Sequence, residues 1–129
     1  MSEAHVCASR RRGFTLIELL VVVVIIGILA AIAIPKFAAT KDKAKLATVK
    51  TDLKNIMTAQ EAYYYDNATY TTSLSSTIFT PSVGNTPLMA GTAASFTATV
   101  SNASITATPK QCTVTVGSGT TGDGVFACS

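Results

Sequence analysis

The 129-residue chain has no tryptophan, one histidine and three cysteines, and only 13% of its residues are charged. His5 and Cys7 precede a run of three arginines at residues 10–12, so the chain beyond the arginines has no histidine and two cysteines. A protein zinc site normally takes four Cys or His ligands, and a Ser or Cys triad takes a histidine as its base. The composition therefore excludes His-dependent triads and argues against a protein zinc site, and we predict no metal or cofactor site.

Beyond the three arginines, positive and negative charges nearly balance. The formal net charge is +3, and the three arginines supply all of it, because seven lysines stand against six acidic residues beyond Gly13. A nucleic-acid-binding domain normally shows a concentrated basic patch. We predict no specific nucleic-acid binding and interpret the lysines between residues 36 and 54, with Asp42 and Asp52 among them, as a solvated face.

The most prominent feature is the apolar run at residues 14–34, which contains one charge, Glu18. As a helix, 21 residues suffice to cross roughly 30 Å of hydrocarbon. Three interpretations compete: a permanent membrane span, an ordinary secretory signal, and a membrane anchor with a further use. Ala31-Ile32-Ala33 resembles a signal-peptidase site, but the run exceeds the usual apolar region of about 7–15 residues and Glu18 interrupts it.

Helical periodicity continues after Pro35. Apolar and long side chains recur at spacings of three and four and form one stripe: Leu46, Val49, Leu53, Ile56, Gln60 and Tyr63. The spacing predicts one long helix from Phe14 to about residue 66. Pro35 is expected to kink this helix, and Gly27 and Pro35 mark where it could loosen.

The remainder of the chain favours a small sheet. Residues 69–91 are rich in Ser, Thr, Pro and Gly and predict a loop to about residue 92. Alternating β-branched residues then predict short strands at 96–100, 104–108, 112–116 and 125–128. A sheet of three or four antiparallel strands needs a covering layer, so we expect an α+β fold with the sheet packed on the stripe of the helix.

Cys112 and Cys128 allow a disulfide, two free thiols or half of a metal site. We favour the disulfide, which would close a loop of about 17 residues and stabilise a small domain by about 3 kcal/mol. Such a bond suits an oxidising exterior and favours an orientation with the N-terminus in the cytoplasm.

The stretch Gly13-Phe14-Thr15-Leu16-Ile17-Glu18, after a short basic leader and before an apolar helix, closely resembles the N-terminal signature of type IV pilins and pseudopilins. The resemblance implies that a prepilin peptidase cleaves after Gly13 and N-methylates Phe14. It divides the chain into a leader (1–13), a transmembrane and filament-core helix (14–35) and a globular pilin domain (36–129).

The resemblance also implies a use for Glu18. A carboxylate inside a bilayer costs roughly 2.5–3.5 kcal/mol on insertion scales, which favours a functional reason to keep it. Cleavage creates an ammonium group at Phe14, and Glu18 of one subunit would pair with Phe14 of its neighbour. This pair would set the axial register of adjacent subunits.

We therefore expect a structural subunit of a type IV pilus-like filament that is not an enzyme and that is a single-pass inner-membrane precursor before assembly. The implied partners are further copies of the chain, minor pilins, the prepilin peptidase, a membrane platform protein and an assembly ATPase. One alternative is a pseudopilin of a type II secretion system. An alternative of another class is a secreted or membrane-tethered binding domain that never polymerises.

Overall fold

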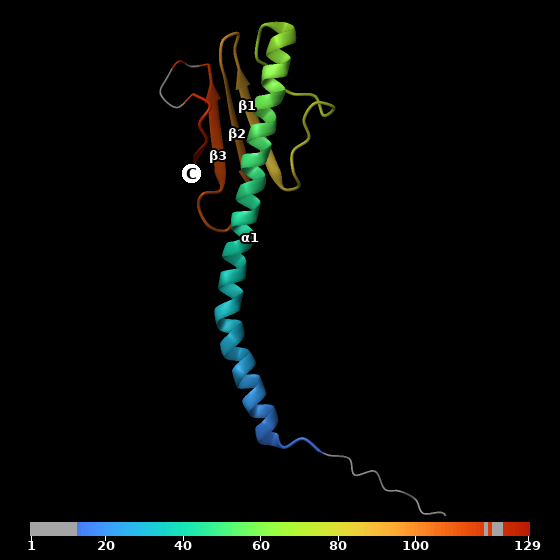
Figure 1. Ribbon diagram of the computed structural model, residues 1–129, viewed down its shortest axis with the longest axis vertical. Coiled ribbons are helices and arrows are strands. Elements are labelled where there is room, and N and C mark those ends of the chain that lie inside the picture. Colours follow the sequence, from blue (N-terminus) through green and yellow to red (C-terminus); the bar gives the residue numbers. More distant parts are fainter. Residues whose placement is uncertain (1–12, 118, 120–122) are drawn as a thin grey trace, which may run out of the picture. The chain divides into compact units, whose positions relative to one another are not determined.

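The computed structural model describes residues 13–117, 119 and 123–129 (Figure 1). Residues 1–12 of the expected leader lie outside the described residues. The chain divides after Lys36 into two compact units, and helix α1 contributes to both. Its elements are α1 (Leu16–Asn67), β1 (Asn85–Gly91), β2 (Phe96–Asn102), β3 (Gln111–Val116) and β4 (Ala127–Cys128).

In the N-terminal unit, α1 runs through Gly27 and continues past Pro35. Its most apolar 18-residue window has a mean hydropathy of 3.2, and none of that window is buried. Among the described residues, α1 is the one helix long and apolar enough to cross a membrane. The large apolar side chains of this unit are exposed on all sides of the helix, so the part of the chain that the structure describes gives them no core to join.

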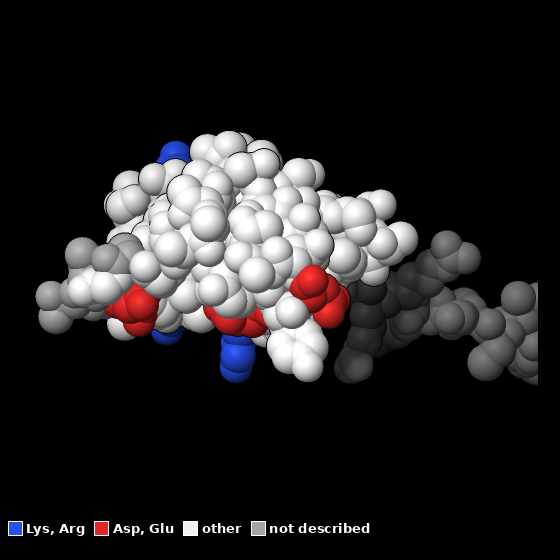
Figure 2. Space-filling model, turned by 90° about the horizontal axis from the view of Figure 1, so that it is seen from above, with Lys and Arg blue, Asp and Glu red and all other residues white. Residues whose placement is uncertain are grey.

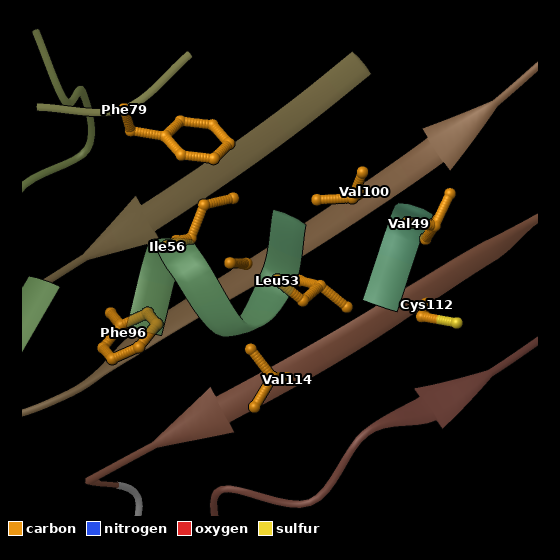
Figure 3. Close-up of a cluster of buried hydrophobic side chains, with 9 residues drawn as sticks. Val49, Leu53, Ile56, Phe79, Phe96, Val100, Cys112 and Val114 are labelled. Atoms are coloured by element: carbon orange, nitrogen blue, oxygen red, sulfur yellow. The ribbon is translucent and has the colours of Figure 1, made fainter. Parts of the chain in front are cut away.

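In the C-terminal unit, α1 packs on the sheet. Figure 3 shows Val49, Leu53 and Ile56 facing side chains of β2 and β3. Each of these three helix residues is fully buried. The stripe predicted from the sequence is therefore the core face of the helix. The other members of the core are Phe79, Phe96, Ala98, Val100, Cys112 and Val114.

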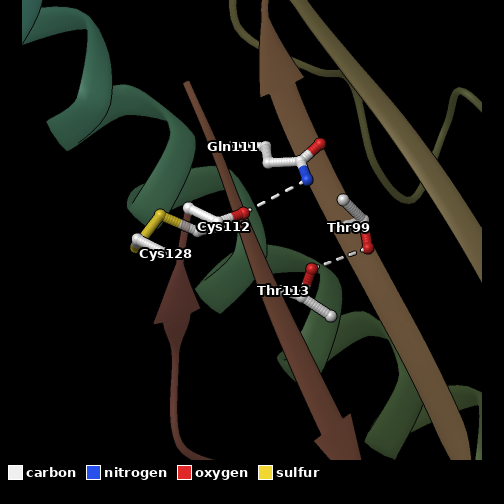
Figure 4. Close-up of a disulfide and its surroundings, with 6 residues drawn as sticks. Thr99, Gln111, Cys112, Thr113 and Cys128 are labelled. Carbon is white, nitrogen blue, oxygen red and sulfur yellow. Dashed lines mark hydrogen bonds between the residues drawn. A yellow bond between two sulfur atoms is a disulfide. The ribbon is translucent and has the colours of Figure 1, made fainter. Parts of the chain in front are cut away.

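The four strands form an antiparallel sheet in the order β1-β2-β3-β4, which makes it a simple meander. Burial alternates along β2, as expected for a strand with one face on a core. Threonines occupy the opposite face: Thr97 and Thr115 form a cross-strand hydroxyl pair at 3.2 Å, and Thr99 and Thr113 another at 2.9 Å (Figure 4). The α+β prediction is confirmed.

One loop prediction and one strand prediction are wrong. Residues 85–91 form β1, although Pro87 and Gly91 made this stretch look like a loop. Proline is tolerated here because β1 is an edge strand whose described sheet neighbour is β2 alone. Residues 104–108 form no strand; Ile105 is buried, but the backbone amides of Thr106 and Ala107 donate to Asp42 instead of to a neighbouring strand.

The end of α1 is close to the predicted position. Asn67 Nδ2 donates to the Tyr63 carbonyl at 3.0 Å, and Ala68 has a positive φ of 54° and donates to the Tyr64 carbonyl. Gln60 then holds the returning chain, because its side-chain amide donates to the Thr71 carbonyl and accepts from the Thr71 amide. A buried polar residue of the stripe thus ties the loop to the helix.

Candidate functional site

The predicted assembly residues lie at the start of α1. Thr15 precedes the helix, and both its backbone amide and its hydroxyl donate to Glu18 Oε2, at 2.9 and 2.7 Å. In return, the Glu18 amide donates to the Thr15 hydroxyl at 3.3 Å. This reciprocal arrangement is a capping box, which satisfies amides that the first turn of a helix leaves without partners.

The capping box was readable from the sequence, because Thr15-Leu16-Ile17-Glu18 has the required spacing before an apolar run. Our sequence interpretation considered only an intermolecular role for Glu18. The geometry adds an intramolecular role: the helix start already holds the carboxylate through one of its oxygens. The observed role of Glu18 is thus to cap its own helix, and this role is distinct from the docking role predicted from the sequence.

The surroundings of Glu18 are apolar and open. Phe14 is 89% exposed, and Leu16 and Ile17 are also exposed. If lipid or another protein covered these apolar side chains, water would be excluded from the carboxylate. A cation beside the carboxylate would then be attracted strongly, because little water would screen the two charges. In chemical terms, this end of the helix can accept an ammonium group from another molecule.

The glycines of the N-terminal unit make no close intramolecular approach. A Cβ added at Gly13 or at Gly27 would meet no described atom within 4 Å beyond the local backbone. The fold of the chain therefore does not require glycine at either position. Any requirement must come from helix flexibility or from a molecule that contacts this segment.

The structure joins Cys112 and Cys128 in a disulfide between β3 and β4, where the two residues are directly paired (Figure 4). Cys112 is fully buried in the core. Ser129 extends the pairing, since its amide donates to the Gln111 carbonyl at 3.0 Å. The bond thus fastens the last residues of the chain to the sheet, and it belongs to the C-terminal unit, separate from the Glu18 region.

Asp42 and Asp52 were wrongly interpreted as part of a solvated face. Asp52 is 2% exposed and accepts from the amide and hydroxyl of Ser82 and from Asn85 Nδ2, at 2.9, 2.8 and 2.7 Å. Asn85 in turn accepts from Asn102 Nδ2 at 2.7 Å. The carboxylate therefore fastens the loop before β1, and the start of β1, to the helix.

Asp42 fastens a second loop in the same way. Its Oδ2 accepts from the amide and hydroxyl of Thr106 and from the amide of Ala107, at 3.0, 2.6 and 3.1 Å. The Thr106 hydroxyl is the main cause that lowers the pKa of Asp42, against an opposing effect of burial. The sequence did contain a signal, because Asp42 lies one turn before Leu46 on the apolar stripe.

In the part of the chain that the structure describes, no group of three or more His, Cys, Asp or Glu side chains could hold a metal ion. Asp42 and Asp52 instead bind backbone amides and neighbouring side chains. The geometry thus offers two distinct features: an exposed apolar helix with a capped carboxylate, and a small sheet domain fastened by two aspartates and a disulfide.

Comparison with known proteins gives these features a context. Residues 8–34 match the family described as the prokaryotic N-terminal methylation motif. The chain is 47% identical over 76 residues to the type IV major pilin protein PilA of Myxococcus xanthus, which covers 59% of this chain and 34% of that protein.

Two further relatives come from different systems. The type II secretion system core protein G of Pseudomonas aeruginosa is 48% identical over 61 residues, covering 47% of this chain and 43% of that protein. The type IV wide pilus major component PilA4 of Thermus thermophilus is 45% identical over 62 residues, covering 48% and 47%. The chain thus matches less than half the length of each of these three relatives. Over part of its length, the chain is therefore similar to type IV major pilins and to a type II secretion system core protein G.

Proposed function

We propose that this chain is a structural subunit that polymerises through the N-terminal half of α1 into a type IV pilus-like filament. The observation that carries the proposal is the apolar segment of α1: a membrane-length helix under a methylation motif, with no buried residue in its most apolar window. A large exposed apolar surface needs lipid or protein to cover it. The membrane would cover this surface in the precursor, and other subunits would cover it in the filament.

Processing comes first in this proposal. A prepilin peptidase removes residues 1–13 and methylates the new terminus at Phe14, which leaves 14–35 as membrane and filament-core helix and 36–129 as the globular domain. The open space around Gly13 supports this step, because the chain's own fold makes no demand for a glycine there.

Assembly then pairs Glu18 of one subunit with the N-terminal ammonium of Phe14 in its neighbour. Thr15 holds the carboxylate through Oε2 in the single chain. The second oxygen can accept a partner without loss of the cap, so docking need not unfold the start of the helix. Gly27 and Pro35 are the positions where the helix would loosen or kink as subunits pack.

The remaining partners follow from the same proposal. The precursor sits in the inner membrane with a single span, and a platform protein and an assembly ATPase supply the force for extraction. Minor pilins would start or end the filament. The chain itself contributes structure and no catalysis.

The first test is the intact mass of the protein from sheared surface material and from membranes. We expect a chain that begins at N-methylated Phe14 and lacks two hydrogens because of the Cys112–Cys128 bond. A chain that begins at Ile34 would instead identify a conventional signal peptide and would overturn the filament proposal.

A second test separates docking from capping. Glu18→Gln removes the charge, whereas Thr15→Val removes the hydroxyl that caps the helix and keeps the charge. If Glu18 docks a neighbour, Glu18→Gln should abolish surface filaments while Thr15→Val reduces them less. Equal losses in the two variants would mean that the carboxylate acts only as a helix cap.

The runner-up is a pseudopilin of a type II secretion system, which the similarity to core protein G of Pseudomonas aeruginosa supports. Deletion of the gene discriminates the two. Loss of surface filaments with normal protein export favours the pilus, and loss of export without loss of surface filaments favours the pseudopilin.

A further inference from the structure

Charges on the C-terminal half of α1 are separated along its length. All five lysines of this half precede residue 55, and Glu61 and Asp66 follow it. The two acids among the lysines, Asp42 and Asp52, are buried and bind loops, so they do not offset the lysines at the surface. The exposed helix is therefore basic at one end and acidic at the other.

A built groove lies at the basic end. It has a volume of about 280 Å³ and nearly all of its surface is apolar. Residues of α1 form one wall and the loop at 105–109 forms the other. Asp42, the one acid that lines the groove, accepts three hydrogen bonds from Thr106 and Ala107 through Oδ2, and these bonds hold the loop against the helix. The lining residues are Ala39, Asp42, Lys43, Leu46, Ile105, Ala107, Thr108 and Pro109.

An aromatic side chain projects at the acidic end. Tyr65 is 90% exposed, whereas its neighbour Tyr64 stacks on Tyr70 with ring centroids 4.7 Å apart. Tyr70 is itself held by a hydrogen bond from its hydroxyl to Glu61. The scaffold below Tyr65 is thus packed, while Tyr65 has no part in that packing. Exposed tyrosines on a firm scaffold are typical anchors of protein interfaces.

Asp66 is a second feature at the acidic end that indicates an interface. It lies in the last turn of α1, which contains no basic residue, and the helix macrodipole disfavours a negative charge at this end. A residue that opposes a local preference often serves another purpose. Figure 2 looks onto one end of the molecule and shows a few acidic and basic side chains on a mostly uncharged surface.

We propose that Tyr65 and Asp66 of one subunit dock on the 39–46/105–109 groove of another copy of the chain, with Tyr65 in the apolar groove and Asp66 beside Lys43. The two surfaces cannot meet within one chain, because 22 residues of helix hold them roughly 33 Å apart. A contact between different surfaces of identical subunits is heterologous and produces open filaments when it does not close into a ring. The proposal rests on the filament function proposed above and adds a contact between globular domains.

The contact can be tested in full-length protein in cells that assemble filaments. A chain with both Ala39→Cys and Ala62→Cys should form a disulfide-linked ladder of multimers in sheared filaments under mild oxidation, because Ala62 is exposed one turn before Asp66 and its replacement keeps Tyr65 and Asp66 in place. The control, Thr86→Cys with Ala62→Cys, places the first thiol on an exposed residue of β1 that does not line the groove and should give no ladder. Filaments without a ladder in the Ala39 pair would overturn the contact and leave the filament function standing.

Charge exchange tests the pairing itself. Lys43→Glu and Asp66→Lys should each lower the yield of sheared filaments by about threefold or more, and the two together should restore it. Lys50→Glu is the matched control, since Lys50 is exposed, lies two turns further on the same face and does not line the groove. Protease resistance of the membrane-held precursor verifies that each variant folds.

Two other outcomes would overturn the proposal. Equal losses for Lys43→Glu and Lys50→Glu, without rescue by Asp66→Lys, would indicate a general attraction of the lysines to anionic phospholipid. A wild-type chain that forms no filaments would remove the proposed function and this contact with it.

Discussion

The two halves of α1 are both helical, but only the second half buries apolar side chains within the chain. Leu29 in the first half is 62% exposed, whereas Leu53 in the second half is fully buried. The first half is the more apolar of the two, so hydrophobicity alone does not decide burial. What differs is the neighbour: a sheet covers the second half, and lipid or other subunits must cover the first.

The largest expected difference between the two halves is in the effect of replacing one leucine by alanine in each. Leu53→Ala should lower the free energy of unfolding by about 2–5 kcal/mol, because it leaves a cavity between α1 and the sheet. Leu29→Ala should change that free energy by less than about 0.5 kcal/mol. Thermal unfolding of both variants in detergent checks this, and similar losses would contradict the division of the helix.

The disulfide should matter only to the second half. Replacement of Cys112 and Cys128 by alanine should lower the free energy of unfolding of the globular domain by about 3 kcal/mol, because the bond closes a loop between residues 16 apart in sequence. Urea unfolding with and without a reductant measures the effect. The reductant should destabilise the wild type and have no effect on the double variant.

The buried aspartates sharpen the comparison, because they fasten loops to the second half. Asp52→Ala leaves donors of Ser82 and Asn85 without their acceptor and should cost about 1–3 kcal/mol. Asp66→Ala, at an exposed position of the same helix, is the matched control and should change stability by less than about 0.5 kcal/mol. Chemical denaturation of the two variants distinguishes a buried anchor from a surface charge.

The smallest effect concerns pH and Asp42. Its pKa is lower in the folded chain than its ordinary value of 3.8, so the carboxylate contributes stability above that value and loses it as the pH falls through the folded pKa. Unfolding measured from about pH 7 to about pH 2 should show a steeper acid loss for the wild type than for Asp42→Asn. Parallel curves would mean that the hydrogen bonds from Thr106 and Ala107 do not favour the ionised form.

Much of the architecture could be predicted from the sequence because it depends on local repetition. The 3.6-residue periodicity marked α1 and its core stripe, and β-branched alternation marked β2 and β3. The capping box was equally local and could have been predicted from Thr15 and Glu18. The predictions for residues 85–91 and 104–108 were wrong because the structure of each segment depends on its neighbour in space. Strand β1 pairs with β2 despite Pro87, and Thr106 binds a helix carboxylate instead of a strand.

The sequence by itself determined the long helix, its apolar first half and the motif that places Phe14 and Glu18 at its start, because each follows from residue types at short spacing. Only the tertiary structure decided the roles of Asp42 and Asp52. From the sequence, a charged residue on a helix is expected to face solvent. Here the residues that donate hydrogen bonds to the two carboxylates lie 30 to 65 residues further along the chain. The position of Asp42 on the apolar stripe was a local sign of burial, but long-range hydrogen bonds have no local pattern, so only the tertiary structure shows which loops the two acids bind.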